Sequence, residues 1–189
     1  MKLHLALVAP VLALGVSAVQ AVPTVFQTVL SGANEAPANA STASGLATVT
    51  YDSALHSLFV AITFAGLSTP ASAGHIHCCT TPGSNIGVAV PFSGLPSALS
   101  GSYSQAFDLT LAATYTAAFV TANGGTAATA ESALATGLAA GRAYANLHDS
   151  VFPGGEIRGF LQPVPEPTTS ALLLAGLGVL GAVARRRAR

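Results

Sequence analysis

The sequence predicts an all-β protein: an antiparallel, Greek-key-like β-sandwich with one or two short alanine-rich helices inserted, flanked by a signal peptide and a C-terminal transmembrane helix. Two observations support this prediction. Short runs rich in β-branched and aromatic residues follow one another and are separated by turn residues, which is typical of sandwiches and barrels. Both ends of the chain are apolar, which explains part of a composition that is 51% hydrophobic and only 7% charged.

The first segment has the features of a secretory signal peptide. Lys2 and His4 give it a basic start, an apolar run follows from Leu5 to Val16, and small residues surround the expected cleavage site after Ala21. A short apolar run before such a site distinguishes a signal peptide from a first transmembrane helix. We therefore expect residues 1–21 to be removed on export and residues 22–162 to form the folded domain.

Eight segments of this domain are expected to be β-strands. They are residues 25–30, 46–51, 58–64, 75–78, 86–90, 103–111, 142–148 and 156–161. The second and third are joined by Asp52-Ser53-Ala54, which favours a hairpin.

One stretch between the expected strands differs in composition. Residues 112–120 and 127–140 are rich in alanine, and Leu134 with Leu138 forms an i, i+4 apolar pair. Alanine and leucine favour helix, so the stretch predicts one or two short helices. The alternative is a disordered insert of low complexity.

Three of the expected strands carry polar residues on one face and an aliphatic residue on the other, because alternate residues of a strand share a face. The polar positions are His75 and His77, Asn146 and His148, and Glu156 and Arg158.

His75, His77 and His148 are candidates for a metal site. Imidazole suits zinc or copper, and two histidines on one strand supply two ligands without a loop. Glu156 would be a fourth ligand or a hydrogen-bond acceptor that fixes a histidine tautomer.

The alternative is a polar network without a metal. In that network the polar residues of the three strands form hydrogen bonds on one sheet face, with Arg158 paired to Glu156 or Asp149.

Cys78 and Cys79 are the only cysteines and are adjacent. Export places them in an oxidising compartment. Three states stay open: a vicinal disulfide, soft ligands for copper beside His75 and His77 with Cys79 facing the histidines, or thiols that are free or paired between chains.

The domain is acidic. Between residues 22 and 164 there are six acidic residues and two arginines, so the net charge is −4. Such a surface repels phosphate backbones, and we expect no nucleic-acid partner.

The C-terminal segment, residues 163–189, has three parts: Pro165, Glu166 and Pro167, then an apolar run to Ala184, then Arg185, Arg186 and Arg187. Residues 168–184 are at the lower limit of length for a membrane span, and the arginines would lie on the cytoplasmic side. This arrangement resembles the PEP-CTERM sorting signal. The resemblance implies transient insertion in the inner membrane and removal of the tail by an exosortase; the alternative is a permanent anchor.

Three motifs of the domain resemble the CHRD domain, which is named from chordin. They are Gly74-His75-Ile76-His77, the segment from Tyr144 to His148, and the segment from Gly154 to Leu161; residues 30–37 fit the start of the domain. The resemblance implies a β-sandwich in an extracellular setting and no defined reaction. A weaker likeness to the Cu,Zn superoxide dismutase sandwich rests on His-x-His alone, because the further ligands of that family are not recognisable.

The sequence therefore predicts an exported bacterial surface or extracellular-matrix protein, located at the cell surface or outside the cell after the tail is removed. The expected role is a binding or structural module in a biofilm matrix, with matrix polysaccharide or surface proteins as partners. The alternative is a secreted copper- or zinc-binding protein with a redox role. We expect no enzyme, because neither a Gly-x-Ser-x-Gly motif nor a phosphate loop occurs.

Overall fold

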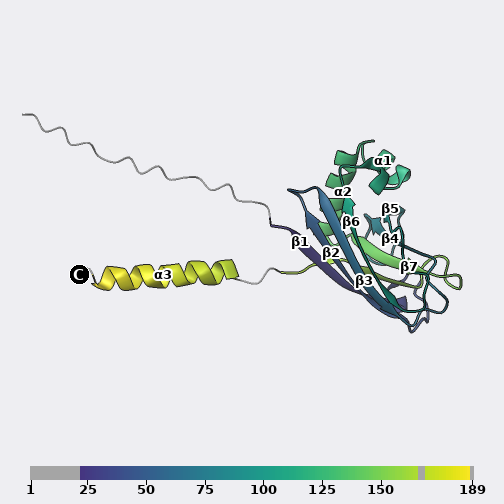
Figure 1. Cartoon of the computed structure of the whole chain (residues 1–189), viewed down its shortest axis with the longest axis horizontal. Helices are drawn as coiled ribbons and strands as arrows, with labels where there is room; N and C mark the ends of the chain where they lie inside the picture. Colours follow the sequence, from purple (N-terminus) through teal and green to yellow (C-terminus); the bar gives the residue numbers. More distant parts are fainter. Residues whose placement is uncertain (1–21, 166–168, 188–189) are drawn as a thin grey trace, which may run out of the picture.

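Nine antiparallel strands join into one sheet (Figure 1). The structure is a computed structural model, and it describes residues 22–165 and 169–187. The strands are β1 (Thr24–Ser31), β2 (Ser44–Asp52), β3 (Ser57–Ala65), β4 (Ala73–Cys78), β5 (Val88–Pro91), β6 (Gly101–Asp108), β7 (Ala143–His148), β8 (Ile157–Phe160) and β9 (Gln162–Pro163). Their order is β5-β4-β7-β8-β1-β2-β3-β6, and β9 pairs with β1. The all-β prediction is confirmed.

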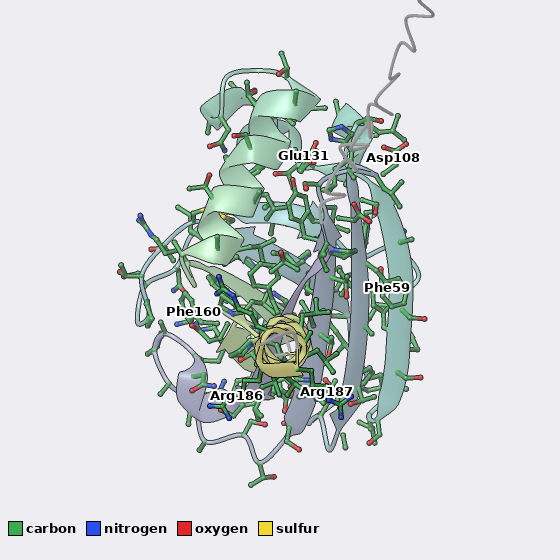
Figure 2. All side chains as sticks on the ribbon, turned by 90° about the vertical axis from the view of Figure 1, so that its left-hand side faces the viewer. Phe59, Asp108, Glu131, Phe160, Arg186 and Arg187 are labelled. Carbon is green, nitrogen blue, oxygen red and sulfur yellow. A yellow bond between two sulfur atoms is a disulfide. The ribbon has the colours of Figure 1, made fainter. Side chains whose placement is uncertain are left out.

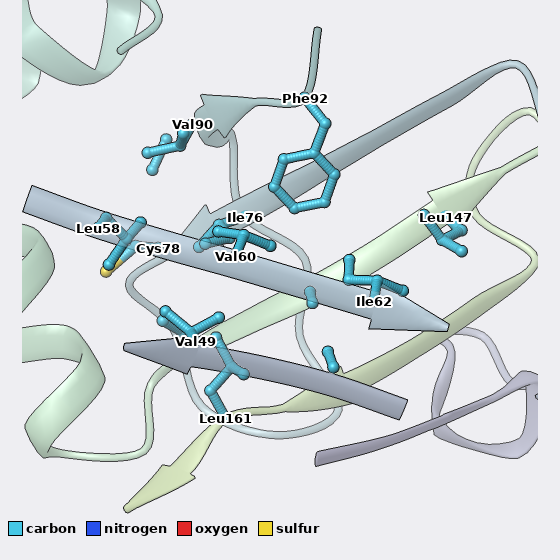
Figure 3. Packing of buried hydrophobic residues seen from close by; sticks show 14 of the residues in the cluster. Val49, Leu58, Val60, Ile62, Ile76, Cys78, Val90, Phe92, Leu147 and Leu161 are labelled. Atoms are coloured by element: carbon cyan, nitrogen blue, oxygen red, sulfur yellow. The ribbon is translucent and has the colours of Figure 1, made fainter. Parts of the chain in front are cut away.

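The sheet curls so that its two halves face each other across the hydrophobic core. β8 meets β1 at a single residue pair, Arg158 with Ser31, whereas β1 and β2 are paired along eight residues. The bend at this weakly paired junction brings β3 over β4 and β7. Figure 3 shows Val60 and Ile62 of β3 crossing over Ile76 and Leu147. The two predicted layers are therefore halves of one continuous sheet.

Short helices cover one end of the curled sheet, as the alanine-rich stretch predicts. They are the 3₁₀ turn η2 (Ala112–Thr114) and the helices α1 (Ala117–Ala122) and α2 (Ala127–Ala139), whereas a separate 3₁₀ turn, η1 (Gly32–Asn34), follows β1 and lies against β8. The side chain of Thr116 accepts a hydrogen bond from the N–H of Phe119 and starts α1; Thr126 starts α2 with a capping box. Leu134 and Leu138 are fully buried, so their predicted i, i+4 pair is the face that α2 packs on the sheet.

The C-terminal residues form α3 (Thr169–Arg187), which Figure 1 draws apart from the sheet. Among the residues described by the structure, no helix is both long and apolar enough to cross a membrane. This corrects the prediction of a membrane-spanning helix over residues 168–184. The apolar part of the helix, residues 171–184, is about 21 Å long at 1.5 Å per residue, against about 30 Å of hydrocarbon in a bilayer, and Arg185–Arg187 occupy the last turn.

Two of the predicted targeting features lie outside the described residues. They are the signal peptide, residues 1–21, and Glu166 and Pro167 of the sorting motif.

Candidate metal centre

Three histidines converge on the outer face of the β4–β7 pair. His75 and His77 lie on β4, and His148 ends the neighbouring strand β7, so the antiparallel register places the three side chains together. One ring nitrogen of each lies within 4.8 Å of the corresponding atoms of the other two. Their chain neighbours Ile76 and Leu147 point to the opposite side, into the core (Figure 3). The alternation along each strand therefore separates the imidazoles from the core.

Backbone carbonyls fix the tautomers of two of these imidazoles. His77 Nδ1 lies 2.7 Å from the carbonyl oxygen of Ile86, and His148 Nδ1 lies 3.0 Å from that of Pro153. A carbonyl oxygen only accepts, so in both rings Nδ1 carries the hydrogen and Nε2 keeps its lone pair. Carbonyl acceptors of this kind orient the histidine ligands of metals.

The Nε2 atoms of His77 and His148 remain for a metal ion, because Nδ1 of each ring binds a backbone carbonyl. His77 Nε2 is buried and has no hydrogen-bond partner among the described residues. His148 Nε2 lies 3.3 Å from His75 Nδ1. Two nitrogens that each lie 2.0–2.1 Å from a tetrahedral zinc ion are about 3.3–3.4 Å apart. The pair thus has the spacing of two ligands of one ion.

All three imidazoles are neutral at pH 7. Burial, followed by the proximity of His148 and His77, lowers the pKa of His75 from 6.5 to about 4. Burial also lowers the pKa values of His77 and His148, although their carbonyl acceptors act in the opposite direction. Neutral imidazole is the form that binds a metal, so no proton has to leave when an ion enters near neutral pH.

Tyr144 and Arg158 form a second layer of contacts beside the histidines. The His77 ring stacks on Tyr144 with a centroid distance of 4.6 Å and an interplanar angle of 4°. The guanidinium carbon of Arg158 lies 4.8 Å from the centroid of the same tyrosine ring. These contacts hold the ring of His77 in one orientation.

A buried polar network lies next to this layer, and its acid is Glu35, which the sequence analysis did not identify. Asn146 Nδ2 donates to Glu35 Oε1 at 2.6 Å, and Arg158 Nε lies 3.7 Å from Glu35 Oε2. Burial raises the pKa of Glu35 to about 7, although Arg158 and Asn146 lower it. Asn146 and Arg158 are therefore joined through Glu35, and the expected pairing of Arg158 with Glu156 or Asp149 is wrong. Only the resemblance of residues 30–37 to the start of a CHRD domain pointed to this segment.

Glu156 does not join the histidines. Its Oε1 accepts hydrogen bonds from the hydroxyls of Ser41 and Ser68, at 2.6 and 2.8 Å, and from the backbone N–H of Ser68 at 2.9 Å. Asp149 is held in the same way by Thr69. These donors occupy the carboxylates away from the imidazoles, which corrects the prediction that Glu156 is a ligand or fixes a histidine tautomer.

The cysteines form a vicinal disulfide, Cys78–Cys79. Cys78 points into the core, and Cys79 Sγ lies 3.5 Å from the carbonyl oxygen of Ala133 in α2. The first of the three predicted states is thus the one in the structure. Cys79 does not face the histidines, because the disulfide turns its sulfur towards α2.

Two family models match the chain. The CHRD domain matches residues 26–161, and the PEP-CTERM protein-sorting motif matches residues 163–188. No curated protein and no solved structure matches it. The first match includes all three histidines, and the second includes the arginines of α3.

Proposed function

The chain belongs to the CHRD domain family, and from this premise we propose that it is a surface protein that binds a zinc or copper ion through His75, His77 and His148. Its PEP-CTERM motif indicates export and C-terminal processing by an exosortase, so the protein lies at the cell surface or outside the cell. The metal centre therefore belongs to an extracellular domain.

The observation that carries the proposal is the Nε2 atom of His77. It is buried, it lacks a partner within the described residues, and it belongs to a ring that has one nitrogen within 4.8 Å of a nitrogen of each of the two other imidazoles. A buried polar atom without a partner costs about 1–3 kcal/mol. A metal ion would satisfy this atom and would replace the hydrogen bond between His148 Nε2 and His75 Nδ1.

The ligand chemistry favours a divalent ion of intermediate softness. Three imidazoles with no thiolate suit Zn²⁺ or Cu²⁺, because both sulfurs are in the disulfide. Three protein ligands leave room for a water molecule or another small ligand. We propose a binding role and no reaction, since the nearby carboxylates of Glu156 and Asp149 are held by serine and threonine residues.

The test is metal content and metal-dependent stability of the protein purified from the periplasm. We expect about one ion per chain and a rise in Tm on adding Zn²⁺ or Cu²⁺ to stripped protein; an ion 100-fold above its Kd stabilises a fold by about 2.7 kcal/mol. His77→Gln and His148→Gln should both remove this effect.

His56→Gln is the matched control, because His56 lies on the turn between β2 and β3 and pairs with Glu131 at 2.9 Å. It should bind metal like the wild type. Less than about 0.1 ion per chain with no rise in Tm at saturation would reject the proposal, as would equal loss of binding in His56→Gln.

A further inference from the structure

The outer face of β1, β2, β3 and β6 carries an array of uncharged side chains. The register forms three rows across the four strands. They are Val29–Leu46–Thr63–Ser102, Gln27–Thr48–Ala61–Ser104 and Val25–Thr50–Phe59–Ala106. The acids that point outward from these strands, Asp52 and Asp108, both lie in the row of Ser57, at one end of the strands, and the three rows themselves carry no charge. Figure 2 shows Asp108 at this end.

The array offers free hydroxyl groups beside small apolar surfaces. Within the part of the chain that the structure describes, the hydroxyls of Thr50, Thr63, Ser102 and Ser104 bind no protein group; only Thr48 is engaged, by Gln27 at 3.2 Å. A depression of about 260 Å³ opens among the rows. Its outward-facing lining is Leu46, Thr48, Ala61, Thr63, Ser102 and Ser104.

Phe59 adds an exposed aromatic ring to the third row. It is 46% exposed although it lies in a central strand, and Figure 2 shows it along the sheet, away from Asp108. Large aromatic side chains usually lie in the interior, where they bury much apolar area. Beside hydroxyl groups, such a ring can stack on the C–H face of a sugar.

We infer that this face binds an uncharged polysaccharide. A glycan presents hydroxyl groups and apolar C–H faces together, which match the mixed rows of threonine, serine, alanine and Phe59. A polyanion would meet the domain's net charge of −4, and no cation lies in the rows to compensate. This inference is independent of the metal centre, which lies on another part of the sheet.

A second copy of the chain fits the face less well. Four strands about 4.8 Å apart and three rows about 6.8 Å apart cover roughly 400 Å² of sheet, whereas a stable dimer buries about 800 Å² on each partner. The rows also contain more hydroxyl-bearing than large apolar side chains. The area and the chemistry therefore favour a polymer that lies across the rows.

The test is affinity gel electrophoresis of the secreted protein in dextran, in hydroxyethylcellulose and in alginate. We expect retardation by at least one of the two neutral polymers and none by anionic alginate. Ala61→Glu places a charge in the middle row and should weaken binding about fivefold or more. Ala61→Gln, whose side chain has the size of glutamate but no charge, should retain most of the binding. Phe59→Ala should also weaken binding, because it removes the aromatic ring.

Val151→Glu is the control for added charge, because Val151 is 56% exposed on a loop away from the rows. It should bind like the wild type, as should His77→Gln, which tests independence from the metal centre. The variants of Ala61, Phe59 and Val151 should keep the Tm of the folded protein, since these three side chains are solvent-accessible.

Three results would overturn the inference. The first is retardation by neither neutral polymer or by alginate alone. The second is binding that Ala61→Glu and Phe59→Ala leave unchanged. The third is a dimer in sedimentation that Ala61→Glu dissociates, because the face would then join two copies of the chain.

Discussion

Replacement of Gly137 by alanine should destabilise the domain through one close contact. Gly137 lies in α2 directly over the disulfide, and a Cβ atom added there would be 2.2 Å from Cys79 Sγ and 2.3 Å from Cys78 Sγ. Real Cβ atoms essentially never approach a neighbour within 3.0 Å. The two sulfurs are bonded to each other at the end of β4, so neither can swing aside as a flexible side chain would. Either α2 or the disulfide has to move.

The expected loss in the free energy of unfolding of Gly137→Ala follows from two opposing effects. Overpacking a core costs about 1–3 kcal/mol. The distance between the added Cβ and Cys79 Sγ must grow from 2.2 Å to an ordinary van der Waals contact of about 3.6 Å, so the cost belongs at the upper end of that range. Alanine is favoured over glycine in a helix by about 1 kcal/mol. The net loss is about 2 kcal/mol, which corresponds to a fall in Tm of roughly 6–7 °C for a domain of this size.

Urea unfolding followed by circular dichroism, together with the Tm, measures this loss. Gly154→Ala is the control, because no atom lies within 4 Å of the position of its added Cβ. An unhindered change from glycine to alanine stabilises a protein by about 0.4–1 kcal/mol through the unfolded state. If Gly137→Ala unfolds at the same urea concentration as the wild type or a higher one, the packing of α2 on the disulfide is not as tight as the structure has it.

Three further changes test the polar interior. Arg158→Ala should lower the free energy of unfolding by about 3 kcal/mol, the lower end of the range for removing one partner of a buried pair, because Glu35 loses its cation but can take up a proton near neutral pH. A loss below about 1 kcal/mol in urea unfolding would contradict this. The pKa of His75 is about 4 in the folded protein and 6.5 in the unfolded chain, so the unfolded chain binds more protons between these values. The stability that His75 contributes is therefore complete above pH 6.5 and is lost as the pH falls towards 4. His75→Gln should flatten the dependence of Tm on pH between these two values. An unchanged slope would show that His75 is not the residue responsible for this pH dependence. Tyr51→Phe removes the hydroxyl that donates to Glu131 at 3.0 Å and should cost about 1 kcal/mol, seen as a small fall in Tm; a Tm equal to that of the wild type would show that the bond contributes nothing.

The strands and the histidine face could be predicted because both depend on local alternation. His75 and His77 share a face on any strand, and Ile76 between them must then face the core. The pairing of β4 with β7, which places His148 beside them, joins residues some seventy positions apart. Periodicity within one segment carries no information on that pairing.

The partner of Arg158 was not predictable for the same reason. Glu156 and Asp149 are its near neighbours in the chain, and the sequence analysis expected one of them. The fold instead places Ser41 and Ser68 on Glu156 and brings Glu35 to the guanidinium. Which acid pairs with a buried base depends on which loop covers the sheet at that point.

The sequence by itself determined that this chain is exported, that its domain is an antiparallel β-fold with a short helical insert, and that its histidines lie on the face opposite the core. Local periodicity suffices for the fold class and the histidine face, because it acts over a few residues at a time, and export follows from the sorting motif at residues 163–188. The tertiary structure alone decided that the sheet curls on itself at the β8–β1 junction, that three imidazoles converge while Glu156 does not, and that uncharged rows align across four strands. Each of these depends on strand register and loop placement, which are set by the packing of segments far apart in the chain.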